Sequence, residues 1–165
     1  MFGFKNSNIY IEGLGIKKSS LKIENGKFTS FEEEQDFIEL DDKYIIVPGF
    51  IDEHIHGANG SDAMDATSKA IHNIASSLPQ DGVTSFLATT MTMDEEHIHK
   101  SLINIANYSQ EENEANLLGI HLEGPFISSK YCGAQDPSKI IKASEEKSII
   151  RSSIYACNSE CICTG

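Results

Sequence analysis

Basic residues are scarce in this sequence. Its 165 residues include 13 lysines and arginines against 25 aspartates and glutamates, which gives a formal net charge of −12. Nucleic-acid binding needs a basic face that neutralises phosphates, so this charge balance argues against a nucleic-acid partner. A phosphorylated small molecule is still compatible, because a few backbone N–H groups and one or two cations can hold a single phosphate.

Long apolar runs are also missing. No stretch has the roughly 20 apolar residues that a membrane-spanning helix needs. Residues 1–10 also lack the basic and apolar regions of a signal peptide. We therefore expect a cytoplasmic protein with no membrane partner.

Cysteines are few and unevenly placed. Cys132 stands alone, whereas Cys157, Cys161 and Cys163 crowd the end of the sequence. Their C-x3-C-x-C spacing matches no structural zinc pattern. We therefore favour reduced thiols in a tail without regular structure, and a thiolate metal site is the alternative.

Residues 1–47 predict a small β module. Its clearest signal is Asn25-Gly26, because a type I′ hairpin turn needs positive φ at both central residues. A sheet of about 40 residues is small for independent stability, so we expect it to pack against another part of the protein. The expected strands are Asn8–Glu12, Leu21–Glu24, Lys27–Phe31, Phe37–Leu40 and Tyr44–Val47.

From Pro48-Gly49 onwards the pattern alternates between strand and helix, which predicts right-handed βαβ units and a parallel sheet over residues 48–142. A helix beginning at a cap formed by Thr92 or Asp94 is expected to bury Ile98, Leu102, Ile105 and Ala106. Residues 143–165 form an atypical tail. The expected strands are Phe50–His56, Val83–Thr89 and Leu117–Leu122, and the expected helices are Met64–Leu78, a second one ending near Tyr108, and a weaker candidate at Pro137–Ile150.

The stretch PGFIDEHIHGANG carries the strongest functional signal. Side chains of a strand alternate between faces, so Asp52, His54 and His56 share one face. The histidines lie where the strand ends, and this is the end of the strands at which α/β barrels carry their chemistry. Two converging imidazoles suit a divalent metal, whereas the alternative is a pair of core histidines. Asp52 is expected to orient an imidazole.

Glu123 is the third candidate metal ligand, because it ends the third strand at the same edge of the sheet. His121 faces the same interior, and we expect it to support the site rather than bind the metal. His97 and His99 fall in a predicted helix, where residues two apart point in nearly opposite directions. We therefore expect both to be surface residues, together with His72.

Four segments together resemble the N-acetylglucosamine-6-phosphate deacetylases of the amidohydrolase superfamily: PGFIDEHIHG, SDAMDA, DGVTSFLATTMT and GIHLEGPF. The resemblance covers about residues 47–137. It implies a (β/α)8 barrel with a β-sandwich built from both chain ends, of which this chain would supply the β module and the first three βα units, an incomplete barrel. His54 and His56 would be metal ligands on the first strand and Glu123 the ligand on the third.

The resemblance also implies a substrate loop, GAQDP, in which the backbone of Ala134 contacts the sugar phosphate. Many relatives have GAHNP there, so Gln135 and Asp136 are departures. The implied reaction converts N-acetylglucosamine 6-phosphate into glucosamine 6-phosphate and acetate. The implied cofactor is one or two divalent ions of Zn, Fe, Mn, Co or Ni, and the implied assembly is a homodimer.

The family's catalytic aspartate and later histidine ligands follow the third strand, and no residue after Pro137 matches them. We therefore expect a C-terminally truncated and inactive chain with no catalytic residue of its own, ending in a frameshifted or replaced tail. The alternatives are another amidohydrolase, such as a dihydroorotase-like or adenine-deaminase-like protein, and a non-catalytic fragment that binds a metal or a partner.

Overall fold

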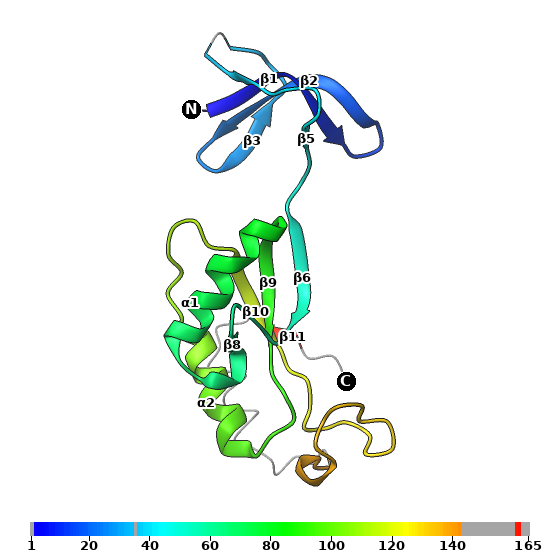
Figure 1. The fold of residues 1–165 in the computed structure, drawn as a ribbon, viewed down its shortest axis with the longest axis vertical. Helices are drawn as coiled ribbons and strands as arrows, with labels where there is room; N and C mark the ends of the chain where they lie inside the picture. Colours follow the sequence, from blue (N-terminus) through cyan, green and yellow to red (C-terminus); the bar gives the residue numbers. More distant parts are fainter. Residues whose placement is uncertain (1, 35, 143–160, 163–165) are drawn as a thin grey trace. The chain divides into compact units, whose positions relative to one another are not determined.

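The computed structural model describes residues 2–34, 36–142 and 161–162 (Figure 1). The chain forms two compact units, Met1–Pro48 and Gly49–Gly165, so the Pro48-Gly49 turn signal lies at the junction. Cys157, Cys163 and most of the expected tail lie outside the described residues. Within the described part, no helix combines the length and the apolar character that a membrane crossing requires.

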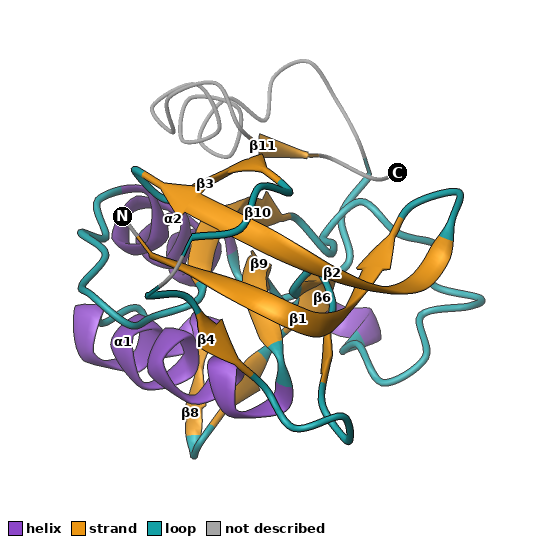
Figure 2. Cartoon of the chain, turned by 90° about the horizontal axis from the view of Figure 1, so that it is seen from above, coloured by secondary structure: helices purple, strands orange, loops and turns teal. Residues whose placement is uncertain are grey.

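The first unit is a five-stranded sheet built around one long strand. Strand β1 (Phe2–Ile11) pairs with β2 (Gly15–Glu24), and both are seen as long arrows in Figure 2. Strand β3 (Lys27–Ser30) follows β2 antiparallel, whereas the short strands β4 (Ile38–Glu39) and β5 (Ile45–Ile46) run parallel to β1. Its buried apolar residues are Ile9, Leu21 and Phe37.

Two hairpins connect β1 to β2 and β2 to β3, and the sequence predicted only the second. The turn at Asn25-Gly26 is confirmed, because Asn25 has φ 50° and Gly26 has φ 72°. The β1–β2 hairpin was missed, and both strands are longer than expected. Lys17, Lys18 and Ser19 occupy the first half of β2, so that segment shows no apolar alternation although its backbone pairs fully with β1.

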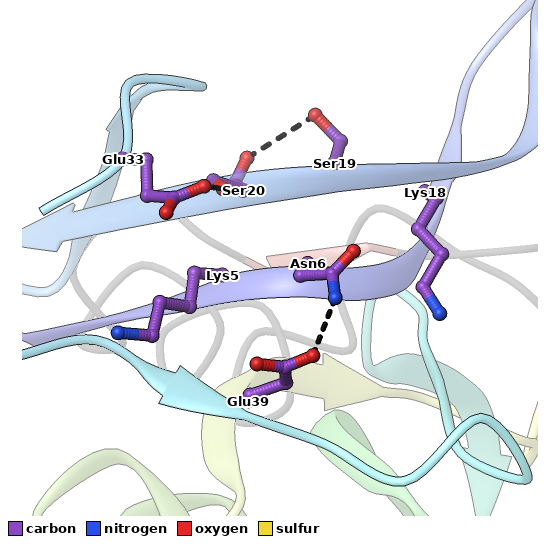
Figure 3. Close-up of a pocket in the computed structure, with 7 residues that line it drawn as sticks. All are labelled: Lys5, Asn6, Lys18, Ser19, Ser20, Glu33 and Glu39. Atoms are coloured by element: carbon purple, nitrogen blue, oxygen red, sulfur yellow. Dashed lines mark hydrogen bonds between the residues drawn. The ribbon is translucent and has the colours of Figure 1, made fainter. Parts of the chain in front are cut away.

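The β module also carries a polar hollow of about 540 Å³ (Figure 3). The Ser20 hydroxyl donates to a Glu33 carboxylate oxygen 3.3 Å away. The Asn6 amide donates to Glu39, as a dashed line in Figure 3 shows. Lys5 and Lys18 also line it, so its two cations and two carboxylates balance. This hollow therefore presents no net charge to a ligand.

The second unit contains a parallel four-stranded sheet in the order β11-β10-β9-β6. The three strands expected from the sequence are confirmed as β6 (Phe50–Ile55), β9 (Val83–Thr89) and β10 (Asn116–His121). The fourth is β11 (Cys161–Ile162), where the expectation of no regular structure is wrong, because Cys161 pairs with Ile120 of β10. The described residues form a mixed α/β unit without a closed barrel.

The expected helix Met64–Leu78 is divided into three pieces. They are the 3-10 turn η1 (Ala63–Asp65), the helix α1 (Ser68–Ser77) and the 3-10 turn η2 (Leu78–Asp81). The division falls at Ala66, whose φ of 51° is left-handed and cannot continue a helix. Thr67 then caps α1, because its hydroxyl accepts a hydrogen bond from the Ala70 N–H.

Helix α2 (Glu95–Ala106) begins at Asp94 and not at Thr92. The Asp94 carboxylate accepts a hydrogen bond from the His97 backbone N–H at 3.1 Å. Ile98, Leu102 and Ile105 are buried as expected, but Ala106 is exposed at the end of the helix.

The expected helix Pro137–Ile150 is wrong over its described part. Only the 3-10 turn η3 (Pro137–Lys139) forms, and Ile140 then has an extended ψ of 131°. Residues 143–150 lie outside the described part of the chain. A proline can begin a helix, but the apolar residues that suggested this one, Ile140 and Ile141, follow the turn outside any helix.

The core of the second unit lies between its sheet and its two helices. β6, β9 and β10 are adjacent in chain order, so right-handed crossovers place α1 and α2 on the same face. Ile71 and Ile74 of α1 and Leu102 of α2 pack in one cluster with Phe86 and Ile120 of the sheet. This packing holds the carboxyl ends of three parallel strands at one edge, where the candidate ligands follow.

A two-stranded turn separates β6 from α1. β7 (Gly57–Ala58) and β8 (Ser61–Asp62) pair antiparallel directly after the histidines. Gly57 is required there, because a Cβ on it would lie 2.9 Å from the Asp62 Cα and closer still to the Ser61 carbonyl. The glycine-rich stretch thus turns the chain away from the strand end.

Candidate metal centre

The two histidines of the first strand converge at its carboxyl end. The Nε2 atoms of His54 and His56 are 3.3 Å apart. Their side chains are half-exposed, at 48% for His54 and 33% for His56. The Asp52 carboxylate accepts a hydrogen bond from the His54 backbone N–H at 3.0 Å, so Asp52 fixes the strand backbone rather than an imidazole through this contact.

Glu123 brings its carboxylate to both imidazoles. Its Oε2 atom lies 3.1 Å from His54 Nε2 and 3.1 Å from His56 Nε2. The same oxygen is buried and makes no hydrogen bond, although its neighbours are so close. A buried oxygen without a hydrogen bond is costly unless another partner supplies the attraction.

A small divalent ion fits the spacing of these three atoms. Zinc bound tetrahedrally at about 2.0–2.1 Å from nitrogen and oxygen ligands separates the ligand atoms by roughly 3.3 Å. The separations among His54, His56 and Glu123 are 3.1, 3.1 and 3.3 Å. Two imidazoles and one carboxylate are also a donor set that suits Zn, Fe, Mn, Co or Ni.

The second oxygen of Glu123 belongs to a hydrogen-bonded network. Glu123 Oε1 accepts a hydrogen bond from Gln135 Nε2 at 2.8 Å, and the Glu123 backbone N–H donates to Thr90 Oγ1 at 3.1 Å. Gln135 Oε1 accepts in turn from the Thr92 backbone N–H at 2.6 Å. The segment after β9 therefore holds the Glu123 backbone, and Gln135 of the loop after β10 holds its carboxylate.

Gly124 allows the close approach that this network needs. A Cβ on Gly124 would collide with the Thr92 side chain, and its φ of 71° is one that glycine adopts without strain. The Glu-Gly pair of the LEGPF segment thus places the carboxylate and lets the loop pass directly over Thr92.

His121 lies beside the three atoms without joining them. Its ring packs against the His54 ring with 4.4 Å between centroids, and its Nδ1 atom is 2.9 Å from the Glu53 carbonyl oxygen. These contacts link His121, at the end of β10, to His54 and Glu53 of β6, next to the candidate ligands.

His97 is exposed, as expected for a surface residue of α2. Its Nδ1 atom lies 3.0 Å from each carboxylate oxygen of Asp94. These hydrogen bonds lower the pKa of Asp94. His97 and His99 do not join the His54 group.

The His72 side chain is 43% exposed, as expected for a surface residue, but it also contacts a buried carboxylate. Its Nδ1 atom lies 2.6 Å from a carboxylate oxygen of Glu114, whose side chain is only 1% exposed. Tyr108 donates to both Glu114 oxygens, at 2.9 and 2.8 Å. Burial and the neighbouring Glu114 raise the pKa of Tyr108.

His72, Glu111 and Glu114 form a second group whose atoms are close enough for a metal ion. Here, however, the buried Glu114 carboxylate already accepts hydrogen bonds from the Tyr108 hydroxyl and from the Glu111 backbone N–H, 2.9 Å away. The group ties α1 to the loop before β10, beside a backbone hydrogen bond from Ala115 to Ala75. We interpret it as a structural contact.

Two adjacent residues of the GAQDP loop differ in their exposure to solvent. Ala134 is exposed, whereas Gln135 is buried with 6% of its surface accessible. The sequence singled out Gln135 only as a departure from the family pattern and gave it no role. Its contact with Glu123 depends on the path of the loop, which no local periodicity encodes.

The chain is similar in sequence to known deacetylases. No family model matches the chain. An N-acetylglucosamine-6-phosphate deacetylase of Bacillus subtilis (strain 168) is 38% identical over 151 residues, which cover 86% of this chain and 38% of the relative. The chain is similar to members of the N-acetylglucosamine-6-phosphate deacetylase family. It spans well under half the length of this relative.

Other comparisons agree with this assignment. A crystal structure of N-acetylglucosamine-6-phosphate deacetylase from Thermotoga maritima matches with a TM-score of 0.75 and 31% identity, over 92% of this chain and 39% of that one. An N-acetylgalactosamine-6-phosphate deacetylase of Escherichia coli O157:H7 is 33% identical over 118 residues, 71% of this chain and 31% of the relative. The resemblance inferred from the sequence is confirmed, and the chain matches part of the fold of the Thermotoga maritima enzyme.

Proposed function

We propose that this chain carries part of the metal centre of an enzyme that hydrolyses the N-acetyl group of N-acetylglucosamine 6-phosphate. The products would be glucosamine 6-phosphate and acetate. The observation that carries the proposal is the triangle formed by His54, His56 and Glu123, in which a buried carboxylate oxygen meets two imidazole nitrogens without a hydrogen bond.

In this proposal the three side chains hold a divalent ion. His54 and His56 present Nε2, and Glu123 presents Oε2. Such an ion lowers the pKa of water towards ~7 and polarises a carbonyl group, which is the chemistry that amide hydrolysis needs. β6, β9 and β10 then correspond to the first three strands of the barrel, and the ligands follow the first and the third.

The loop after β10 is proposed to bind the sugar phosphate. Ala134 is exposed beside the buried Gln135, so its backbone is accessible while the next side chain anchors the loop. Gly133 has a φ of 59°, which bends the chain at this point. The proposed contact is a backbone hydrogen bond to a phosphate oxygen.

The proposal also covers what this chain does not do by itself. Among the described residues we assign no carboxylate to proton transfer, because Asp52 contacts the strand backbone and Glu123 faces the imidazoles. We therefore propose that the 165-residue chain, tested alone, binds the metal but has negligible deacetylase activity.

Titration of the metal-free chain with Zn²⁺ or Co²⁺ by calorimetry tests the site. We expect one strong site whose affinity falls at least a hundredfold in His54→Ala and in His56→Ala, because each removes one of three ligands. His97→Ala is the matched control on an exposed histidine, and His72→Ala tests the second group; both should bind like the wild type. Unchanged affinity in His54→Ala and His56→Ala would rule the site out.

A further inference from the structure

Gln135 has a buried side chain, and the oxygen and the nitrogen of its amide group have separate partners. Its Oε1 faces the Thr92 backbone N–H at 2.6 Å, and its Nε2 faces Glu123 Oε1 at 2.8 Å. A backbone N–H can only donate, so the amide oxygen must face Thr92. The NH2 group is thereby directed at the carboxylate, which can only accept.

In this arrangement the two oxygens of the Glu123 carboxylate have different partners. Oε1 is held by Gln135, and Oε2 is left facing the Nε2 atoms of His54 and His56. Without a donor on Oε1, the carboxylate could rotate about its terminal torsion, which is broad for glutamate. A hydrogen bond at that oxygen therefore selects the orientation that a metal ion would meet.

The Thr92 contact makes Gln135 a rigid support. Thr92 follows strand β9, and its buried backbone N–H fixes the amide plane. The Gln135 backbone N–H also donates to the Cys132 carbonyl at 3.0 Å, which anchors the loop itself. In this short segment Ala134 is therefore exposed, and the buried Gln135 side chain holds Glu123.

We propose that Gln135 is a positioning residue for the metal centre, which fixes the Glu123 carboxylate through Oε1 and so sets the affinity of the site. The inference rests on the proposed function, because it takes Glu123 as a ligand. Hydrogen-bonded partners of metal-binding carboxylates typically change metal affinity by about 10- to 100-fold when they are removed.

Gln135→Glu separates positioning from simple support of the loop. Glutamate has nearly the same size and keeps an oxygen for the Thr92 N–H, but it replaces the donor to Glu123 with a second carboxylate oxygen. We expect the dissociation constant for Zn²⁺ at neutral pH to rise about 10- to 100-fold. The metal-free chain should still fold, but with lower stability, because the new buried carboxylate faces that of Glu123. The visible spectrum of the Co²⁺-loaded chain should also change, because the carboxylate ligand is reoriented.

Gln135→Met provides a second variant of similar length that lacks both hydrogen-bonding groups. It should lose at least as much metal affinity as Gln135→Glu. Gln80→Met is the matched control, because Gln80 is exposed in η2 and makes the same exchange away from the site. We expect its metal affinity to equal that of the wild type.

The outcomes separate the two proposals. If His54→Ala abolishes binding while Gln135→Glu and Gln135→Met bind within threefold of the wild type, the metal site stands and the role of Gln135 is wrong. If His54→Ala leaves binding unchanged, the metal site itself is wrong. Loss of affinity in both Gln135 variants with an intact Gln80→Met control supports the inference.

Discussion

Asp94 shows how one exposed carboxylate organises the start of α2. It accepts from the His97 backbone N–H, and the His97 side chain lowers its pKa. A carboxylate with a lowered pKa in the folded state contributes stability above its unfolded value, near 3.9, and loses it as the pH falls through the folded value. Urea unfolding should therefore show Asp94→Ala to be less stable than the wild type at pH 7, with a difference that shrinks below about pH 4.

The exposed substitution Glu112→Ala is the control for Asp94→Ala, because Glu112 caps no helix. It should leave the unfolding curve almost unchanged across the same pH range. A difference between Asp94→Ala and the wild type that grows as the pH falls would contradict the role of Asp94.

At the candidate site, the sequence predicted the residues whose positions follow from the regular geometry of strands and parallel sheets. His54 and His56 were found because strand side chains alternate, and Glu123 because parallel strands end at one edge. The structure brings these three together. Gln135 was not found, because its contact joins a loop to a strand end and depends on the path between them. The contact of His72 with Glu114 was missed for the same reason.

At the scale of elements, Ala66 decides where α1 begins. Its φ of 51° is strained for an L-residue with a Cβ, whereas glycine adopts it freely. Ala66→Gly should therefore raise the free energy of unfolding by roughly 0.5–1 kcal/mol in urea unfolding.

Ala106→Gly makes the same exchange at an exposed helical position in α2 and serves as the control. It should lower stability, because glycine is unfavourable in a helix by up to about 1 kcal/mol. Destabilisation by Ala66→Gly as well would show that residue 66 is not left-handed in solution.

The elements that the sequence predicted correctly have strong local signals, and those it missed do not. β9 is a nearly continuous apolar run, and the Asn25-Gly26 turn has a specific residue requirement. The helix expected at Met64–Leu78 was divided, because nothing in an apolar periodicity marks Ala66 as left-handed. β11 has two residues and forms only by pairing with β10, so it has no local pattern to read.

At the scale of the molecule, the described sheet places the proposed ligands at one edge but does not close into a barrel. The metal-loaded 165-residue chain should therefore release no acetate from N-acetylglucosamine 6-phosphate above the rate of a metal-free sample. A coupled acetate assay checks this, with a full-length relative as the positive control. Clear acetate release that disappears in His54→Ala would contradict this expectation, because it would show that the 165-residue chain is active by itself.

The central claim is that His54, His56 and Glu123 hold a divalent ion. Diffraction from zinc-soaked crystals of the chain, measured on both sides of the zinc absorption edge, tests it most directly. The account predicts an anomalous peak between His54 Nε2, His56 Nε2 and Glu123 Oε2, at about 2.0–2.2 Å from each atom. A peak at His72, Glu111 and Glu114 with none between the first three residues would contradict it.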